Sequence, residues 1–499
     1  MMKLEQITRP LIAYSLCFDD VMKTFLSAHG IAYDKAFSAC WEFQYERGKN
    51  FSEAVNFPHV GFKKYESIGI DVKKIKVEGK EELSAVIAQV KAGKVVPIHY
   101  DGYVCPWDKL QKRRRWHNLH TVLAYAADDK KKYFCVDDPF YEISNQRVPY
   151  AAFGTVSRFY LAIDITGYTK KTYAQLQSES MASFLTTPIF EQMEQFLSDF
   201  KERISEDNYE GIFTVEWVRM IEQGYMTRHY LWLFYKSLYH ETEKPQHGKA
   251  ALLFYVALQA WKECVTQSHK GWRRRDKKER SESFARSFSR VIETEKEIAE
   301  VLLNGCDACE GILSEGIPLR NAHCTPLPLD ALLNARGCKK SRFERSKADI
   351  TGEGEYILPA KKHLKSVRAK EIAYPVFFGE KQDHVRCEGQ HIKIPHRDYD
   401  GIAFLACSEW GRSLFSAVFQ GRKNTYYCDA ILNDFTYPED NSVRIGVSCL
   451  VGKKRDKVFQ KNIYLQSLYF SFPKDDIIEE IILPDCVSVH LFSAVLVDE

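Results

Sequence analysis

One hairpin decides how this chain folds: Trp116-His117-Asn118-Leu119-His120-Thr121-Val122-Leu123-Ala124-Tyr125, followed after a short gap by Tyr133-Phe134-Cys135-Val136-Asp137-Asp138-Pro139. Both runs contain the apolar, β-branched and aromatic residues that are typical of buried strands. Asp128-Asp129-Lys130-Lys131 between them fits a polar turn. The sequence therefore predicts two adjacent strands, with His120 on the first and Asp138 at the end of the second.

A cysteine near the N-terminus completes a possible catalytic set. Cys17 heads a segment with helical apolar spacing, formed by Cys17, Val21, Met22, Phe25 and Leu26. A free thiol is only slightly ionised at neutral pH, but a nearby imidazole can take its proton and a helix start favours the resulting anion. The other nitrogen of that imidazole needs an acceptor to fix its tautomer. We therefore predict Cys17 as nucleophile, His120 as base and Asp138 as the residue that orients His120.

Each of these residues also has an ordinary structural interpretation. A cysteine on an apolar helix face is usually a small buried residue, and Asp-Pro commonly opens a turn. Asp137 alternates to the opposite face of its strand and is the reserve choice for the orienting carboxylate. The order of a cysteine, a histidine in a strand and an aspartate at the next strand end favours the catalytic interpretation.

Composition places the chain among ordinary soluble proteins. Its 499 residues predict two to four domains, and its net charge of +3 gives no overall electrostatic preference for nucleic acid. No apolar run approaches the roughly 20 residues of a membrane span, and the N-terminus lacks an apolar signal core. We expect a cytoplasmic protein without membrane or nucleic-acid partners, whose 14 cysteines are mostly reduced.

One group of cysteines has part of the pattern of a zinc site. Cys306 and Cys309 form a CxxC, and Cys324 and Cys338 follow it. A zinc ribbon needs a second closely spaced pair, and Cys324 and Cys338 are widely separated. The sequence therefore favours scattered reduced thiols and predicts no metal site.

The periodicity of apolar residues changes twice along the chain. Residues 1–168 mix helix and strand signals, residues 169–305 follow a 3.6-residue period rich in aromatic side chains, and residues 306–499 contain short strand-like runs with many glycines and prolines. These changes predict a multidomain α+β chain with an α/β N-terminal domain, a helical middle region and a C-terminal antiparallel β-sandwich.

The N-terminal third resembles a known family. Asp101-Gly102-Tyr103-Val104-Cys105-Pro106-Trp107, followed by His117, His120 and the hairpin that ends at Asp138-Pro139, resembles the N-terminal domain of butirosin biosynthesis protein H. Cys17-Phe18-Asp19-Asp20 with Leu26-Ser27-Ala28-His29-Gly30 is similar to the nucleophile helix of that family. The resemblance implies a papain-like fold, in which base and orienting residue lie on adjacent strands.

The same resemblance implies an activity and partners. It implies an acyltransferase that takes an acyl or aminoacyl group from the phosphopantetheine thioester of an acyl or peptidyl carrier protein and passes it to an amine, as in nonribosomal-peptide or polyketide-type antibiotic biosynthesis. The phosphopantetheine arrives on the carrier, so no resident cofactor is expected. Papain has a Gln upstream of its cysteine, whereas residues 9–16 contain neither Gln nor Asn. The backbone N–H of Cys17 then supplies one oxyanion donor, and the second is unassigned.

Two further regions bear on partners. Arg113, Arg114 and Arg115 precede the strand of His120, and a basic rim there would attract an acidic carrier protein, although a solvated loop has the same composition. Asp383-His384-Val385-Arg386 and the strand that follows Tyr399 resemble jelly-roll, galactose-binding-like accessory domains, with docking or dimerisation as their expected role. The oligomeric state is not predicted.

Two other functions fit the same residues. A cysteine hydrolase, either a peptidase or a thioesterase, would use the same triad with water as acceptor. A non-catalytic scaffold would use the site only to bind a carrier protein or peptide. Transfer and hydrolysis share an acyl-enzyme, and a pocket that admits an amine while excluding water favours transfer.

Overall fold

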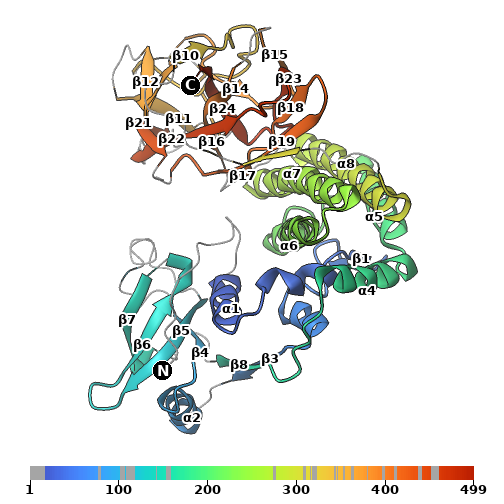
Figure 1. Cartoon of the computed structure of the whole chain (residues 1–499), viewed down its shortest axis with the longest axis vertical. Helices are drawn as coiled ribbons and strands as arrows, with labels where there is room; N and C mark the ends of the chain where they lie inside the picture. Colours follow the sequence, from blue (N-terminus) through green and yellow to red (C-terminus); the bar gives the residue numbers. More distant parts are fainter. Residues whose placement is uncertain are drawn as a thin grey trace. The chain divides into compact units, whose positions relative to one another are not determined.

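The computed structural model of the chain describes residues 17–76, 80–101, 107, 119–141, 143–152, 159–273, 277–306, 311–314, 316, 323–341, 344, 347–351, 355–360, 365–378, 380–395, 399–409, 413–436, 441–450 and 460–498. These residues form two compact units (Figure 1). Unit 1 comprises the chain up to Phe43 together with Phe57–Ile189, and unit 2 comprises Gln44–Asn56 and Phe190–Glu499. The chain is a multidomain α+β protein.

Unit 1 is built on an antiparallel sheet with the strand order β3-β8-β4-β5-β6-β7. The strands are β3 (Asp71–Lys76), β4 (Val96–Asp101), β5 (Leu119–Asp128), β6 (Tyr133–Asp138), β7 (Ile143–Pro149) and β8 (Phe159–Asp164). The predicted hairpin is β5–β6, and Leu123 pairs with Asp137 in its register. The structure thus confirms the two adjacent strands and their charged turn.

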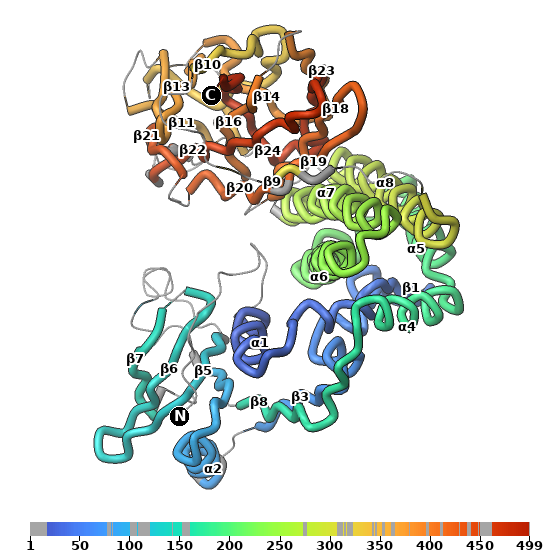
Figure 2. Tube along the Cα trace, viewed as in Figure 1, coloured from blue at the N-terminus to red at the C-terminus, as the bar shows by residue number. Residues whose placement is uncertain are grey.

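Helices cover this sheet because each has one apolar face. In α2 (Lys80–Lys91), Val86 and Val90 are buried in one cluster with Val122 and Ala124 of β5. In α1 (Cys17–Ala28), Val21, Met22 and Leu26 are buried, as the helical spacing predicts, and the helix packs beside β5 (Figure 2). The remaining helical segments of unit 1 are η1 (Tyr33–Ala39), η2 (Phe62–Ile68), η4 (Pro139–Tyr141), η5 (Tyr150–Ala152) and α4 (Tyr173–Thr186).

Unit 2 begins with a helical region of α5 (Ile189–Ser205), α6 (Val215–Thr242), α7 (Pro245–Arg273) and α8 (Lys277–Asn304). The sequence pattern predicts α7 only over Ala250–Val265. The helix starts earlier because Pro245 is favoured at a first helical position. It ends later because buried polar residues such as Ser268, which accepts a hydrogen bond from Trp217 Nε1 at 2.9 Å, extend its inner face. Apolar spacing alone does not mark such residues.

Two short strands from early in the chain belong to this helical region. These are β1 (Gln44–Tyr45) and β2 (Val55–Asn56), which pair with each other. The Tyr45 hydroxyl donates to Asp199 Oδ2 of α5 at 2.8 Å, and the ring of Phe51 packs against Phe196 and Trp217. The sequence offered no sign that this hairpin packs with residues about 150 positions later.

The rest of unit 2 contains two main sheets. One has the order β10-β24-β16-β22-β21-β11, with β14 also paired to β24, and the other has the order β15-β23-β18-β19-β9. The strands are β9 (Gly311–Ser314), β10 (His323–Pro326), β11 (Glu355–Pro359), β12 (Ser366–Ala369), β13 (Ile372–Pro375), β14 (Val385–Arg386), β15 (His391–Lys393), β16 (Gly401–Ser408), β17 (Ser413–Leu414), β18 (Val418–Gly421), β19 (Thr425–Asp429), β20 (Ile431–Leu432), β21 (Ser442–Leu450), β22 (Gln460–Ser471), β23 (Ile478–Ile482) and β24 (Val489–Asp498).

The two sheets share a core, as in a sandwich. Phe404 of the larger sheet and Phe419 of the smaller one lie in one buried cluster, with ring centroids 6.3 Å apart. The opposite face of the larger sheet is also covered, because Leu405 is buried in a second cluster with Val367 and Tyr374 of the β12–β13 hairpin. Every residue of β16 is therefore buried, which explains its continuous apolar run.

One strand pair departs from the predicted antiparallel arrangement. β9 pairs with β19 in parallel, with Tyr426 opposite Gly311. β9 immediately follows the helical region and joins the edge of the smaller sheet by this pairing.

The predicted boundaries at 168/169 and 305/306 follow changes in secondary structure and stay a prediction, whereas the two units are defined by packing. In the described residues, no helix combines the length and apolar content that crossing a bilayer requires.

Candidate active site

Cys17 lies beside the strand of His120. It is the first residue of α1 in the described part of the chain, and its thiol is partly exposed. Its Sγ is 3.5 Å from Thr121 Oγ1 of β5. The packing of α1 on β5 thus brings Cys17 to the strand that the sequence assigned to the base.

His120 and Asp138 meet across the β5–β6 hairpin. Asp138 Oδ2 is 2.7 Å from His120 Nε2, and both side chains are buried. Because a carboxylate only accepts hydrogen bonds, this contact places a proton on Nε2. The imidazole of His120 also hydrogen-bonds the side chain of Cys17, for which Nδ1 is the remaining ring nitrogen. The structure therefore brings together the three residues Cys17, His120 and Asp138.

The reserve residue Asp137 does not reach His120 by any described hydrogen bond. Its Oδ1 instead accepts the backbone N–H of Asn145 at 2.7 Å. This separation follows from the alternation of side chains along β6, because neighbouring residues point to opposite faces. Alternation was the sequence argument for preferring Asp138, and the geometry agrees with it.

The charges at the site favour an ion pair between Cys17 and His120. Burial raises the pKa of the Cys17 thiol, but the hydrogen bond and charge of His120, with hydrogen bonds from Thr121, outweigh it and leave that pKa below its usual value. Burial lowers the pKa of His120, whereas hydrogen bonds to Asp138 and Cys17 and their charges raise it to about 10. Both shifts favour the form of the pair in which Cys17 is a thiolate and His120 an imidazolium, the reactive form of a cysteine nucleophile.

Aromatic side chains contact both the Asp138 carboxylate and the His120 imidazole. Trp107 Nε1 donates to Asp138 Oδ2 at 2.7 Å, so this carboxylate oxygen accepts from both an indole and an imidazole. Phe140 and Tyr141 of η4 pack on the ring of His120, with centroids 5.7 and 5.5 Å away. Trp107 fixes Asp138 and was not assigned a role from the sequence, although it lies in the stretch that carries the family resemblance. Only the fold reveals which carboxylate its indole meets.

A buried ion pair holds the first turn of α1. Lys64 Nζ of η2 is 2.7 Å from Asp19 Oδ1, and the Tyr33 hydroxyl donates to the same oxygen at 2.8 Å. The side chains of Lys64 and Asp19 are 0% and 1% exposed. Because Asp19 is two residues from Cys17, this pair helps to fix where the thiol lies.

We expect Lys64→Met to destabilise unit 1 by about 3 kcal/mol, because it leaves the Asp19 carboxylate buried without its ammonium partner. Hydrogen exchange of the α1 amides and urea denaturation measure this loss. Lys63→Met is the matched control, since Lys63 is exposed and adjacent. The double variant Asp19→Asn with Lys64→Met should recover part of the stability. Equal stabilities of the Lys63 and Lys64 variants would show that the ion pair does not hold α1.

Several predicted residues lie outside the described part of the chain. These are the proposed docking residues Arg113, Arg114 and Arg115, and also Cys309 of the CxxC. Of the other three cysteines in that group, Cys338 is buried, whereas Cys306 and Cys324 are partly exposed. Among the described residues, no three His, Cys, Asp or Glu side chains are grouped as metal ligands would be.

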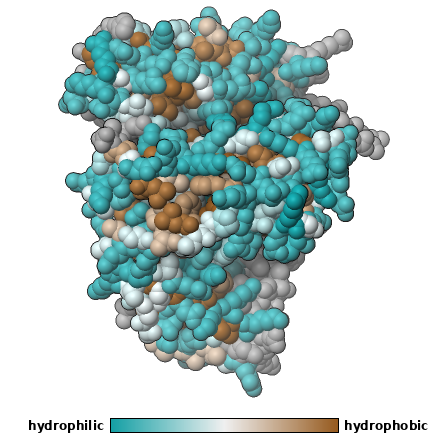
Figure 3. Space-filling model, turned by 90° about the vertical axis from the view of Figure 1, so that its right-hand side faces the viewer, coloured by the Kyte–Doolittle hydropathy of each residue, from teal (hydrophilic) through white to brown (hydrophobic). Residues whose placement is uncertain are grey.

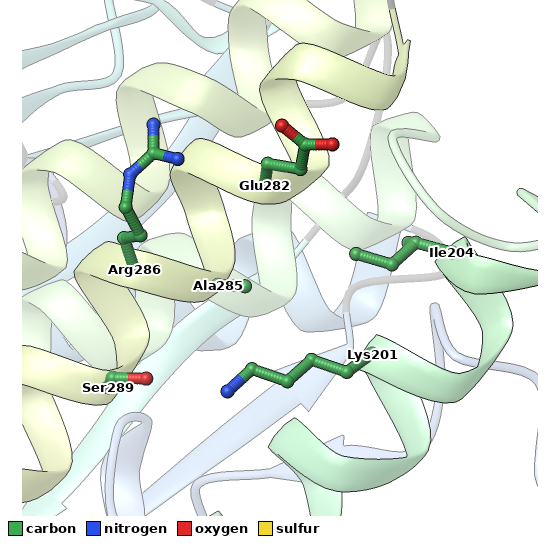
Figure 4. A pocket seen from close by; sticks show the side chains of 6 residues that line it. All are labelled: Lys201, Ile204, Glu282, Ala285, Arg286 and Ser289. Atoms are coloured by element: carbon green, nitrogen blue, oxygen red, sulfur yellow. The ribbon is translucent and has the colours of Figure 1, made fainter.

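Unit 2 contains a separate pocket between α5 and α8. Lys201 and Ile204 of α5 face Ala285, Arg286 and their α8 neighbours Glu282 and Ser289 across it (Figure 4). Its lining combines charged side chains of both signs with the apolar side chains of Ile204 and Ala285. On the face drawn in Figure 3, hydrophilic side chains predominate and apolar ones gather in separate areas. The pocket holds no nucleophile and base pair, so we assign no chemistry to it.

Comparisons with known proteins give no family for this chain. No protein-family model matches it, and no curated protein sequence matches it. Among solved structures, one that it resembles is a GH138 enzyme targeting pectin rhamnogalacturonan II, at 12% sequence identity and a TM-score of 0.12. That match covers 61% of this chain and 34% of the enzyme. At this TM-score the likeness carries no argument about fold or activity.

Proposed function

We propose that this chain is a cysteine-dependent acyltransferase. It moves an acyl or aminoacyl group from a carrier-protein phosphopantetheine thioester to an amine, through an acyl-enzyme on Cys17, in specialised-metabolite biosynthesis. The observation that carries the proposal is the 2.7 Å contact between Asp138 and His120 Nε2, with His120 in turn hydrogen-bonded to Cys17. A nucleophile, a base and a residue that orients the base are the parts that covalent acyl transfer requires.

The fold that we propose for unit 1 is papain-like. Three features support it: Cys17 on a helix beside the sheet, His120 on β5 and Asp138 on the adjacent strand β6. The Nε2 of His120 is held by the carboxylate, which leaves Nδ1 as the ring nitrogen for the interaction with Cys17. This arrangement assigns the two ring nitrogens to separate tasks, orientation and proton transfer.

In the first half-reaction, the Cys17 thiolate attacks the thioester carbonyl carbon. A C–S bond to Cys17 forms, the C–S bond to phosphopantetheine breaks, and the leaving thiolate takes the proton of His120. In the second half-reaction, the amine attacks the acyl-enzyme and His120 accepts a proton from its nitrogen. The C–S bond to Cys17 then breaks, which leaves an amide, a thiolate and an imidazolium.

Intact-mass measurement tests the proposal directly. The full-length protein is incubated with a hexanoyl thioester of N-acetylcysteamine and, separately, with a hexanoylated carrier protein. We expect one hexanoyl group per chain, located on Cys17 by peptide mapping. Absence of any covalent adduct with either donor would overturn the proposed acyl-enzyme.

The acceptor is tested in a second step. The isolated acyl-enzyme is mixed with a series of primary amines, and the products are separated into hexanoyl amide and free hexanoic acid. We expect amide formation to exceed hydrolysis at millimolar amine. Release of the acid alone, at a rate that no amine changes, would assign the site to a hydrolase.

The basic run Arg113–Arg115, which precedes the His120 strand in the sequence, gives a prediction about the carrier. Changing Arg113, Arg114 and Arg115 to Ser should slow acylation by the carrier protein about tenfold and reduce its dependence on salt, because an acidic carrier is attracted by these charges. Acylation by the small N-acetylcysteamine thioester should be unchanged. The control is the corresponding change of Arg273, Arg274 and Arg275, which should affect neither donor. Equal loss with both donors would show that the first run supports the fold or the chemistry.

A further inference from the structure

A second histidine lies behind the nucleophile. Thr121 Oγ1, which is 3.5 Å from Cys17 Sγ, is also 2.9 Å from Nε2 of His99 on β4. Thr121 and His99 are opposite each other in the β4–β5 register, so their side chains share a face of the sheet. Both are buried, with Thr121 fully inaccessible. The proposed triad uses neither residue.

His99 is not suited to be a second base. Burial, together with the positive charges of Lys74 and His120, lowers its pKa to about 3. It is therefore neutral throughout the physiological range, and a base with this pKa takes no proton from an amine near neutral pH. A neutral imidazole has one N–H donor and one acceptor nitrogen, so its role here is to hold a hydrogen bond.

The direction of each hydrogen bond follows from the charge on Cys17. A thiolate only accepts, so the hydroxyl of Thr121 must donate its single proton to Sγ. Its oxygen then accepts the Nε2–H of His99. The backbone N–H of Thr121 also hydrogen-bonds the sulfur, so this residue supplies two of the contacts that the thiolate receives.

We infer that the Thr121 hydroxyl, oriented by His99, stabilises the Cys17 thiolate directly, and that His99 is a positioning residue acting only through Thr121. The inference rests on the proposed function in assigning the thiolate as nucleophile and as leaving group. A thioester sulfur is a poor acceptor, so the contact favours the free thiolate over the acyl-enzyme. It therefore assists release of the acyl group to the acceptor.

The test is the pH dependence of Cys17 alkylation by iodoacetamide, which needs no acyl donor. Trypsin releases residues 4–23, in which Cys17 is the only cysteine, so mass spectrometry can follow this site alone. Thr121→Val keeps the shape and removes the hydroxyl. We expect the midpoint of its profile to rise by about one pH unit, which lowers the alkylation rate about tenfold at pH values well below both midpoints. Thr121→Ser should retain the parent midpoint.

The role of His99 is tested by a double-mutant cycle. His99→Leu should raise the midpoint by less than Thr121→Val, since the hydroxyl remains. The double variant should match Thr121→Val alone, because His99 acts through that hydroxyl. The other charged and titratable groups of the elements around Cys17 are unchanged in all these variants: His120 on β5, Asp138 on β6, Asp19 and Asp20 on α1, Lys64 on η2 and Lys74 on β3.

The outcomes separate this inference from the proposed function. A parent midpoint at the value of an ordinary thiol would overturn both, since no stabilised thiolate would exist. A lowered parent midpoint that Thr121→Val leaves unchanged would overturn the inference alone. Additive shifts of the two single variants would remove His99 from the mechanism. Thr121→Ala, which also removes the hydroxyl, keeps the test decisive if Thr121→Val is too unstable to purify.

Discussion

Cys17→Ala is expected to form no acyl-enzyme and to lose all transfer activity, while folding as the parent does. The alanine removes the only atom that bonds to the acyl group. Cys17 is partly exposed and the substitution removes only its sulfur atom, so this change should cost little stability. Intact-mass spectra after incubation with the hexanoyl thioester give the first result, and thermal unfolding gives the second.

Cys135→Ala is the matched control for this variant. Cys135 is on β6 of the same unit and is also partly exposed, but burial raises the pKa of its thiol instead of lowering it. It should remain unmodified at the pH where Cys17 reacts, and its variant should keep full activity. Transfer by Cys17→Ala at the parent rate would remove Cys17 from the mechanism, whereas loss in both variants would indicate a general effect on unit 1.

The sequence was sufficient for the hairpin and for the relation between its two functional residues. Strand alternation places residues two apart on the same face, so the choice of Asp138 over Asp137 was a matter of local geometry. The helical spacing from Val21 to Leu26 likewise predicted the buried apolar residues of α1, whereas the burial of Asp19, Asp20 and Thr24 had no such signal. These features are local, and local periodicity determines them.

Contacts between distant segments could not be predicted in the same way. The pairing of His99 with Thr121 depends on the register of β4 against β5, which no motif in either strand specifies. Lys64 was an ordinary surface-type residue in the sequence, yet it is buried because the Asp19 carboxylate compensates its charge. Trp107 likewise needed the fold to show that it meets Asp138.

The orienting carboxylate gives the second large expected effect. Asp138→Ala should slow acylation by about ten-thousandfold, the order seen when the third member of a catalytic triad is removed. It leaves the N–H groups of His120 and Trp107 without their common acceptor in a buried site. Single-turnover rates with the hexanoyl thioester measure the effect. Asp137→Ala is the matched control and should stay near the parent rate, because Asp137 binds only the Asn145 backbone among the described hydrogen bonds.

Asp138→Asn separates the charge of this residue from its shape. Its amide oxygen can still accept from His120 and Trp107, so we expect a smaller loss of rate than in Asp138→Ala. The Asp138 carboxylate helps raise the pKa of His120 from its ordinary 6.5 to about 10, so its charge also sets the highest pH at which His120 stays protonated. Acylation needs the imidazolium to protonate the leaving thiolate, and the parent should lose activity as the pH rises through about 10.

In Asp138→Asn this alkaline limit should move to lower pH, because the neutral amide no longer stabilises the imidazolium. The free energy of unfolding should also depend on the protonation of His120. Because the pKa of His120 is higher in the folded protein than its ordinary value of 6.5, the protonated imidazole stabilises the folded state. This stabilisation is complete below pH 6.5 and is lost as the pH rises through about 10. The parent should therefore lose stability across this interval more steeply than Asp138→Asn. If the alkaline limit and the stability profile of the variant both coincide with those of the parent, Asp138 does not control the charge of His120, and the triad loses its orienting member.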